Sequence, residues 1–162
     1  MDDNYLISRL KTKYSDKDTT NFNVFDFLSA FGSPLDAIVY SKLFWPEFVE
    51  VDDMVFLKER FETEEDHISL KEVFRKYGGD RCKVEQAFNF YEIPWDFLCG
   101  RVGETTEEED DWLAERLVEM WAACLRLLYP ERRFIVKLLE PEETGGEIGI
   151  IFYQDREKQE DV

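Results

Sequence analysis

The longest regular pattern of apolar residues lies between Thr105 and Pro130. Its apolar members are Trp112, Leu113, Leu117, Met120, Trp121, Cys124, Leu125 and Leu128. Because these positions return to one side of a helix with a period of 3.6 residues, they predict one long amphipathic helix. Thr105 or Thr106 is expected as its N-cap, with Glu109 closing a capping box, and Pro130 is expected to end it.

Two runs of alternating apolar and polar residues follow this helix, at 133–139 and 148–152. A loop that contains Gly145 and Gly146 separates them. Alternation on both sides of a glycine-rich loop predicts an antiparallel hairpin, whose apolar face packs on the helix.

The first hundred residues predict shorter elements. Asp2 or Asp3 is expected to cap a first helix, and Ser33-Pro34 is a start signal for a helix that ends before Pro46. The other predictions are a buried helix at 24–31, a hairpin at 48–57 around Asp52-Asp53, a helix at 70–77 closed by Gly78-Gly79, and a helix from Asp80 to Tyr91. The predicted fold is a single α+β domain over residues 1–155, with several helices and two β-hairpins, followed by a polar tail at 156–162.

Composition adds a strong charge to this picture. The chain has 162 residues, of which 44% are hydrophobic, and 37 acidic against 20 basic residues give a net charge of −17. No apolar run approaches the roughly 20 residues of a membrane span, and the acidic N-terminus is unlike a signal peptide, so a soluble, cytoplasmic protein is expected. The charge disfavours nucleic acid and anionic membranes as partners and favours a basic protein, although solubility alone also explains it.

Few residues are suited to catalysis or metal binding. His67 is the only histidine, and Glu64 precedes it with the Glu-x-x-His spacing of di-metal helical bundles, which need a second such motif that this chain lacks. Cys82, Cys99 and Cys124 are an odd number without metal-type spacing, as expected of reduced thiols that are buried as small apolar residues. No metal site and no cofactor are therefore predicted.

Motifs typical of enzymes are also missing from the sequence. There is no P-loop, no Gly-x-Gly-x-x-Gly and no Gly-x-Ser-x-Gly pattern, so a non-catalytic protein is expected. A small hydrolase-type enzyme that uses carboxylates, such as Asp52-Asp53 or Asp110-Asp111, and a divalent metal remains the alternative.

Two features are candidates for partner binding. The densest charge run is Glu107, Glu108, Glu109, Asp110 and Asp111, which imitates a row of phosphates for a basic cleft or, alternatively, complements the dipole of the helix it begins. Trp45 and Trp95 each lie beside a proline, and each is either a recognition anchor or an apolar plug at the end of an element. An exposed patch near either tryptophan is a further alternative, in which the protein is a self-associating structural subunit.

In general character the chain resembles the bacterial immunity proteins that neutralise toxins, and equally many other small bacterial domains. It is small, acidic, α+β, poor in histidine and without catalytic motifs. The resemblance is one of type and assigns no role to any residue. It implies an inhibitor that neutralises a basic partner such as a toxin nuclease, through a tight and salt-sensitive complex.

Overall fold

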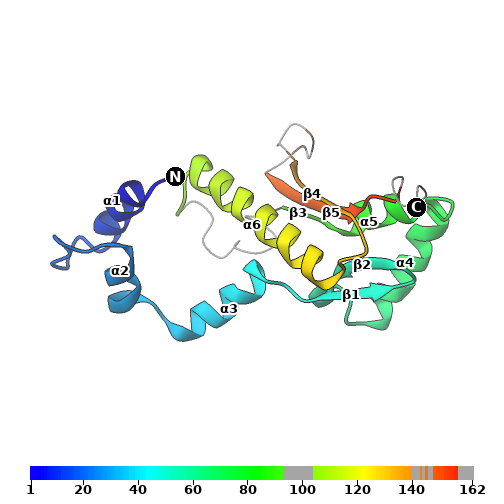
Figure 1. The fold of residues 1–162 in the computed structure, drawn as a ribbon, viewed down its shortest axis with the longest axis horizontal. Helices are drawn as coiled ribbons and strands as arrows, with labels where there is room; N and C mark the ends of the chain where they lie inside the picture. The colour runs from blue at the N-terminus through cyan, green and yellow to red at the C-terminus, as the bar shows by residue number, and fades with distance from the viewer. Residues whose placement is uncertain (93–103, 140–142, 144, 146–147, 157–162) are drawn as a thin grey trace. The chain divides into compact units, whose positions relative to one another are not determined.

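A computed structural model of the chain describes residues 1–92, 104–139, 143, 145 and 148–156, and shows an α+β fold (Figure 1). The helices and strands in these residues are α1 (Asp3–Lys13), α2 (Val24–Phe31), α3 (Pro34–Phe44), β1 (Phe48–Val51), β2 (Met54–Leu57), the short 3-10 helix η1 (Lys58–Arg60), α4 (Glu64–Lys76), α5 (Arg81–Phe88), β3 (Phe90–Glu92), α6 (Glu107–Leu128), β4 (Phe134–Leu139) and β5 (Gly149–Gln154). The predicted fold class is confirmed. The chain forms two compact units, Met1–Ser41 and Lys42–Val162.

The first unit is helical. Asp2 caps α1 by accepting a hydrogen bond of 2.9 Å from the backbone N–H of Tyr5, and Asn23 and Asp26 form a reciprocal capping box at the start of α2. Aromatic rings with centroids 4.0 to 6.3 Å apart hold α1 and α2 together; they belong to Tyr14, Phe22, Phe27 and Phe31. Stacked and edge-on rings thus supply most of the apolar packing of this unit.

The bounds of α2 are as predicted, but its predicted burial is wrong. Only Phe27 is buried, whereas Phe25 and Leu28 are largely exposed. The high apolar content of the helix indicated burial on every side, yet α1 covers only the side that carries Phe27 and Phe31. The helix α3 begins as predicted, since the Ser33 hydroxyl accepts a hydrogen bond of 3.2 Å from the N–H of Asp36.

The second unit is built around α6 and an antiparallel sheet with the strand order β3-β5-β4. Figure 1 shows α6 running along this sheet, and most of its contacts with the sheet are with β4. The predicted C-terminal hairpin is confirmed, with Phe134 opposite Gln154 and Leu139 opposite Gly149. The core between α6 and the strands consists of Val55, Leu57, Tyr91, Ala114, Leu117, Trp121, Leu125, Ile148, Ile150 and Phe152.

The hairpin of β1 and β2 is also confirmed, and it forms a sheet of its own. Its turn residues Asp52 and Asp53 have φ values of 51° and 65°, the left-handed conformation that a two-residue hairpin turn needs. All four residues of β2 are buried. Because strand side chains alternate, Val55 and Leu57 enter the α6 core, while Met54 and Phe56 enter a second core with Phe61, Leu70 and Val84.

Two boundaries between 64 and 92 differ from the prediction. The helix α4 begins at Glu64 instead of residue 70, because Thr63 and Asp66 form a capping box there. The helix α5 ends at Phe88, and Tyr91 lies in β3, where it pairs with Ile150, rather than on the helix. The tertiary partner β5 therefore decides the state of a segment whose own spacing favoured a helix.

Candidate partner-binding surface

The acidic run predicted from the sequence begins α6, with Glu107, Glu108, Glu109 and Asp110 in the first turn and Asp111 directly after it. Two of its five carboxylates serve the start of the helix. Glu109 accepts a hydrogen bond of 2.9 Å from the Thr106 N–H, and the Thr106 hydroxyl accepts one of 3.3 Å from the Glu109 N–H. The Asp110 carboxylate accepts a hydrogen bond of 2.7 Å from the Thr105 hydroxyl. Hydrogen bonding at the start of the helix is therefore sufficient to explain why Glu109 and Asp110 are acidic.

The other three carboxylates of the run have no such role among the described residues. Glu107, Glu108 and Asp111 are exposed and make no hydrogen bond or ion pair with a described side chain. Glu108 and Asp111 continue into Glu115 and Glu119 with spacings of three, four and four residues, which place them on one side of the helix. We call Glu107, Glu108, Asp111, Glu115 and Glu119 the acidic ridge. From Glu108 to Glu119 it extends about 16 Å along α6, from the helical rise per residue.

The orientation of the ridge is fixed by the core on the other side of α6. Leu117, Trp121 and Leu125 are fully buried against the strands, so the acidic ridge faces solvent. Arg116 is the one cation within the ridge, and its guanidinium lies 2.7 Å from the Glu119 carboxylate and 3.8 Å from that of Glu115. One arginine among five carboxylates leaves a strongly negative stripe.

Of the two tryptophans for which an anchor and an apolar plug were the alternatives, Trp45 is exposed and Trp95 lies outside the described residues. Trp45 precedes β1, on a segment held along the second half of α6. The Leu43 carbonyl accepts a hydrogen bond of 2.8 Å from the indole N–H of Trp121, and the Pro46 carbonyl lies 3.7 Å from the Cys124 sulfur. Pro46 is buried and Trp45 is 45% exposed, so Trp45 is available for contact with another molecule.

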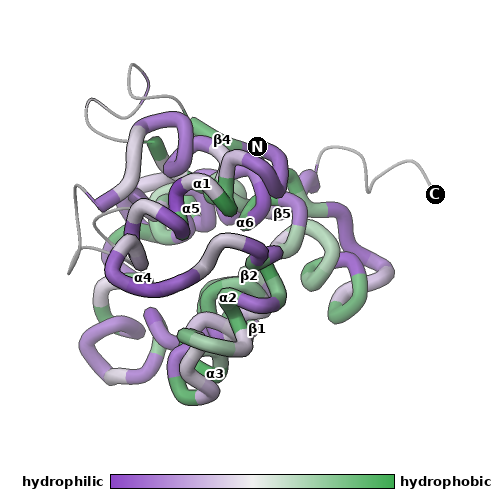
Figure 2. Tube along the Cα trace, turned by 90° about the vertical axis from the view of Figure 1, so that its left-hand side faces the viewer, coloured by the Kyte–Doolittle hydropathy of each residue, from purple (hydrophilic) through white to green (hydrophobic). Residues whose placement is uncertain are grey.

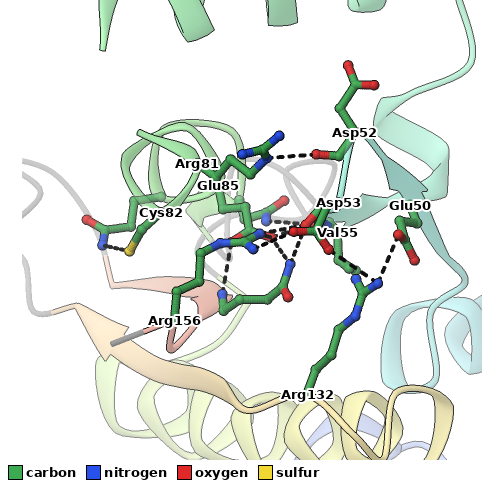
Figure 3. A network of polar contacts seen from close by, with 12 residues as sticks. Glu50, Asp52, Asp53, Val55, Arg81, Cys82, Glu85, Arg132 and Arg156 are labelled. Carbon is green, nitrogen blue, oxygen red and sulfur yellow. Dashed lines mark hydrogen bonds and ion pairs between the residues drawn. The ribbon is translucent and has the colours of Figure 1, made fainter. Parts of the chain in front are cut away.

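A second group of charged residues surrounds Glu85, which is fully buried on α5 (Figure 3). Its carboxylate accepts hydrogen bonds from the Val55 N–H at 2.9 Å, from the Gln154 N–H at 3.0 Å and from the Gln154 side-chain amide at 2.8 Å. The Arg156 guanidinium lies 3.6 Å away. A buried carboxylate is stable only with such compensation, so Glu85 connects α5, β2 and the end of β5.

The turn of the β1–β2 hairpin completes this network. Asp53 binds the Arg156 guanidinium through its carboxylate at 2.8 Å and through its carbonyl oxygen at 2.6 Å. Its carboxylate also lies 3.4 Å from Arg132, which donates a hydrogen bond of 2.9 Å to Glu50. Figure 3 shows these side chains converging on the turn from separate elements. The network therefore has a structural role in holding the hairpin against β5.

A cleft of about 750 Å³ opens beside this network, between α5 and the strands β4 and β5. Its charged and polar lining includes Asp80, Arg81, Cys82, Lys83, Gln86, Tyr153, Asp155 and Arg156. The three cations already have partners: Arg81 with the Asp52 carbonyl at 3.0 Å, Lys83 with the Asp80 carboxylate at 3.2 Å, and Arg156 with Asp53. The cleft is thus large enough for a small ligand, but its cations are engaged within the protein.

The cleft also contains a thiol, that of Cys82. Burial raises the pKa of Cys82, and the Gln86 side-chain amide donates a hydrogen bond of 3.2 Å to its sulfur. Burial also raises the pKa of Cys124. Because the thiolate is the reactive form of cysteine, a raised pKa disfavours nucleophilic chemistry at both positions. Both are free thiols; Cys124 is buried, as predicted, whereas Cys82 is only partly buried, and Cys99 lies outside the described residues.

The residues considered for carboxylate and metal chemistry lie on different elements of the fold. Asp52 and Asp53 form the hairpin turn, whereas Glu64 begins α4. His67 is exposed on α4, with its ring edge-on to Phe61 at 5.2 Å. Among the described residues, no three side chains of His, Cys, Asp or Glu are grouped so as to hold a metal ion.

Sequence reasoning did not anticipate the Glu85 network. Glu85 lies between Val84 and Gln86 on a short helix, and Arg156 falls at the start of the predicted polar tail, so both resemble solvated residues. Their contacts join positions 30 to 103 residues apart, and no local pattern records such a contact. The extension of the acidic ridge to Glu115 and Glu119, by contrast, follows from helical spacing alone.

The described helices include none that is long and apolar enough to cross a membrane. No protein-family model matches the chain, and neither the curated proteins nor the solved structures include a significant match.

Proposed function

We propose that this protein is a non-catalytic acidic binding module that inhibits a basic partner protein, and that the acidic ridge of α6 is its contact surface. The observation that supports this most is the set of exposed carboxylates at Glu107, Glu108 and Asp111, which neither cap the helix nor pair with a described cation. Carboxylates that repel one another on a rigid helix are stabilised by an incoming cationic surface.

The charge of the second unit supports the same proposal. The first unit has six acidic and four basic residues, a net charge of −2, so that −15 of the total of −17 belongs to the second unit, which carries the ridge. Such a field accelerates the approach of a basic protein and makes the complex sensitive to salt. A basic toxin such as a nuclease has the required chemistry, since a ridge of carboxylates occupies the place of a phosphate backbone.

Capture of a partner by the tagged protein from its native cell extract tests this proposal. Three forms are compared: the wild type, a ridge variant with Glu107→Gln, Glu108→Gln and Asp111→Asn, and a control variant. The control, Glu59→Gln, Glu62→Gln and Glu65→Gln, removes the same charge at other exposed positions of the second unit. Neither variant alters the Thr106–Glu109 capping box.

We expect one basic protein to be held at low salt and released at high salt. The ridge variant should hold it about 10-fold less tightly, at a few tenths to 1 kcal/mol per charge, and the control should behave as the wild type. The captured protein is then purified, and its activity should fall when the wild type is added. Equal capture by the ridge variant, or no basic protein at either salt, contradicts the proposal.

The cleft beside α5 is the observation that favours a second candidate, a small hydrolase-type enzyme. Its volume of about 750 Å³ is that of a small-molecule site, and Asp80 and Asp155 line it. If the protein is such an enzyme, Asp155→Asn abolishes turnover of its substrate and leaves the protein folded. The acidic module predicts instead that this variant inhibits the basic partner as well as the wild type does.

A further inference from the structure

The first unit exposes apolar side chains that its own helices do not cover. They are Phe25 at 80% exposure, Leu28 at 59%, Leu35 at 68%, Ile38 at 63%, Val39 at 60% and Tyr40 at 48%. We call this set the α2–α3 apolar surface, and Figure 2 shows hydrophobic stretches of chain along both helices. Its residues belong to the first unit, whereas the acidic ridge belongs to the second.

The surface is too large to be a scatter of exposed apolar residues. Leu35, Ile38 and Val39 have the spacing of one helix face, and every residue of α3 from Pro34 to Ser41 is exposed. With exposures of 48–80%, the six side chains present roughly 100 Å² each, or about 600 Å² in total over α2 and α3. That is at the upper end of apolar patches on monomeric proteins, and a helix with such a face is normally covered.

The charge around this surface indicates what covers it. Between Asn23 and Ser41 the only charged side chains are Asp26 and Asp36, and Asp26 is engaged in the α2 capping box. With a net charge of −2 against −15 for the second unit, the first unit repels a like-charged molecule less than the second unit does. The absence of any Lys or Arg in this stretch disfavours an anionic membrane surface as the occupant.

We propose that the α2–α3 apolar surface binds a second copy of this chain and forms a symmetric dimer. The area of about 600 Å² approaches the roughly 800 Å² that each partner buries in a stable protein interface, and a two-fold axis places the same apolar face on both sides. Screening of the remaining negative charge should make this contact stronger as salt rises. A complex with a basic partner has the opposite dependence on salt, so the two proposals are distinguished in solution.

Analytical ultracentrifugation of the full-length protein tests the dimer, over a hundredfold range of concentration up to about 100 µM. The test variant is Ile38→Glu, which places a carboxylate in the middle of the surface. The control is Leu127→Glu, since Leu127 is 68% exposed on α6 in the second unit. Circular dichroism is expected to show both variants folded, because both replaced side chains are exposed.

We expect the wild type and Leu127→Glu to dimerise, with a dissociation constant that falls as salt is raised from about 0.05 M to about 0.5 M. Ile38→Glu should weaken the dimer at least 30-fold, on the order of one central apolar anchor. A wild type that is monomeric at every concentration, as when the chain's own second unit covers the surface, overturns the proposal. A dimer that Ile38→Glu leaves intact also overturns it. The proposed function does not depend on either result, since the ridge variant tests it separately.

Discussion

The Glu85 carboxylate accepts hydrogen bonds from both the backbone and the side-chain N–H groups of Gln154, 69 residues later in the chain. Both residues are buried, with exposures of 0% and 1%. Gln154 also donates to the Asp53 carbonyl at 2.8 Å, so this pair joins α5, the end of β5 and the hairpin turn. Stability of the second unit should therefore depend on a charged side chain in its interior.

Replacement of Glu85 is expected to destabilise the protein according to the hydrogen bonds that are lost. Glu85→Leu leaves the N–H groups of Val55 and Gln154 buried without an acceptor and should lower the free energy of unfolding by about 3 kcal/mol. Glu85→Gln keeps one acceptor oxygen and should cost about half as much. Urea denaturation measures the free energy of unfolding of both variants. Glu72→Gln, at an exposed position of α4, is the control and should change little.

Trp121 is expected to be the most sensitive position of α6. It is fully buried, its ring lies edge-on to Phe152 at 6.0 Å, and its indole N–H donates to the Leu43 carbonyl. Trp121→Phe should cost roughly 2–3 kcal/mol, because it leaves a cavity and removes the donor to a carbonyl. Trp112→Phe, at a half-buried position of the same helix, should cost less than about 1 kcal/mol. Thermal unfolding measures the stability of both variants. If Trp121→Phe and Trp112→Phe lose the same amount of stability, Trp121 has no special role.

The hairpin turn should tolerate only residues that accept a left-handed backbone. Asp52 has a φ of 51°, and its carbonyl, rather than its carboxylate, binds Arg81. Asp52→Asn should therefore leave the stability nearly unchanged, whereas Asp52→Val should cost about 1–2 kcal/mol because a β-branched residue disfavours this conformation. Differential scanning calorimetry of the two variants makes this comparison. A stable Asp52→Val protein would mean that the turn is not left-handed.

Glu47 should contribute to the pH dependence of stability. Hydrogen bonds from Lys42 and then from Lys58 lower the pKa of Glu47 from 4.5 to about 2. A carboxyl group whose pKa is lower in the folded state contributes fully above its unfolded pKa, and the contribution is lost as the pH falls from about 4.5 towards 2. The difference in melting temperature between wild type and Glu47→Gln should be present at pH 7 and shrink across this window.

Salt distinguishes this effect from a change in packing. The Glu47 side chain is 45% exposed, so its ion pairs are screened by dissolved ions. The difference between wild type and Glu47→Gln at pH 7 should therefore decrease when salt is added. A difference that is constant with pH and salt would show that the ion pairs contribute nothing.

The amino-acid sequence by itself determined the elements whose signals are local. The spacing from Trp112 to Leu125 and the Thr106 capping box specified α6, alternation specified the C-terminal hairpin, and the Asp52-Asp53 pair specified the turn of the first hairpin. Helical spacing also placed Glu108 and Asp111 on one face. Periodicity, caps and turn residues act within a few positions of one another, so they can be read without knowing the fold.

Only the tertiary structure decided which faces are covered. It left Phe25 exposed although its helix is strongly apolar, paired Tyr91 with β5 instead of extending α5, and buried Glu85 beside the end of β5. Tyr91 and Glu85 have partners that are distant in the sequence. Phe25 lies on a side of α2 that no other described element of the first unit covers. Burial and the pairing of a buried charge are properties of the assembled chain, which local propensity does not encode.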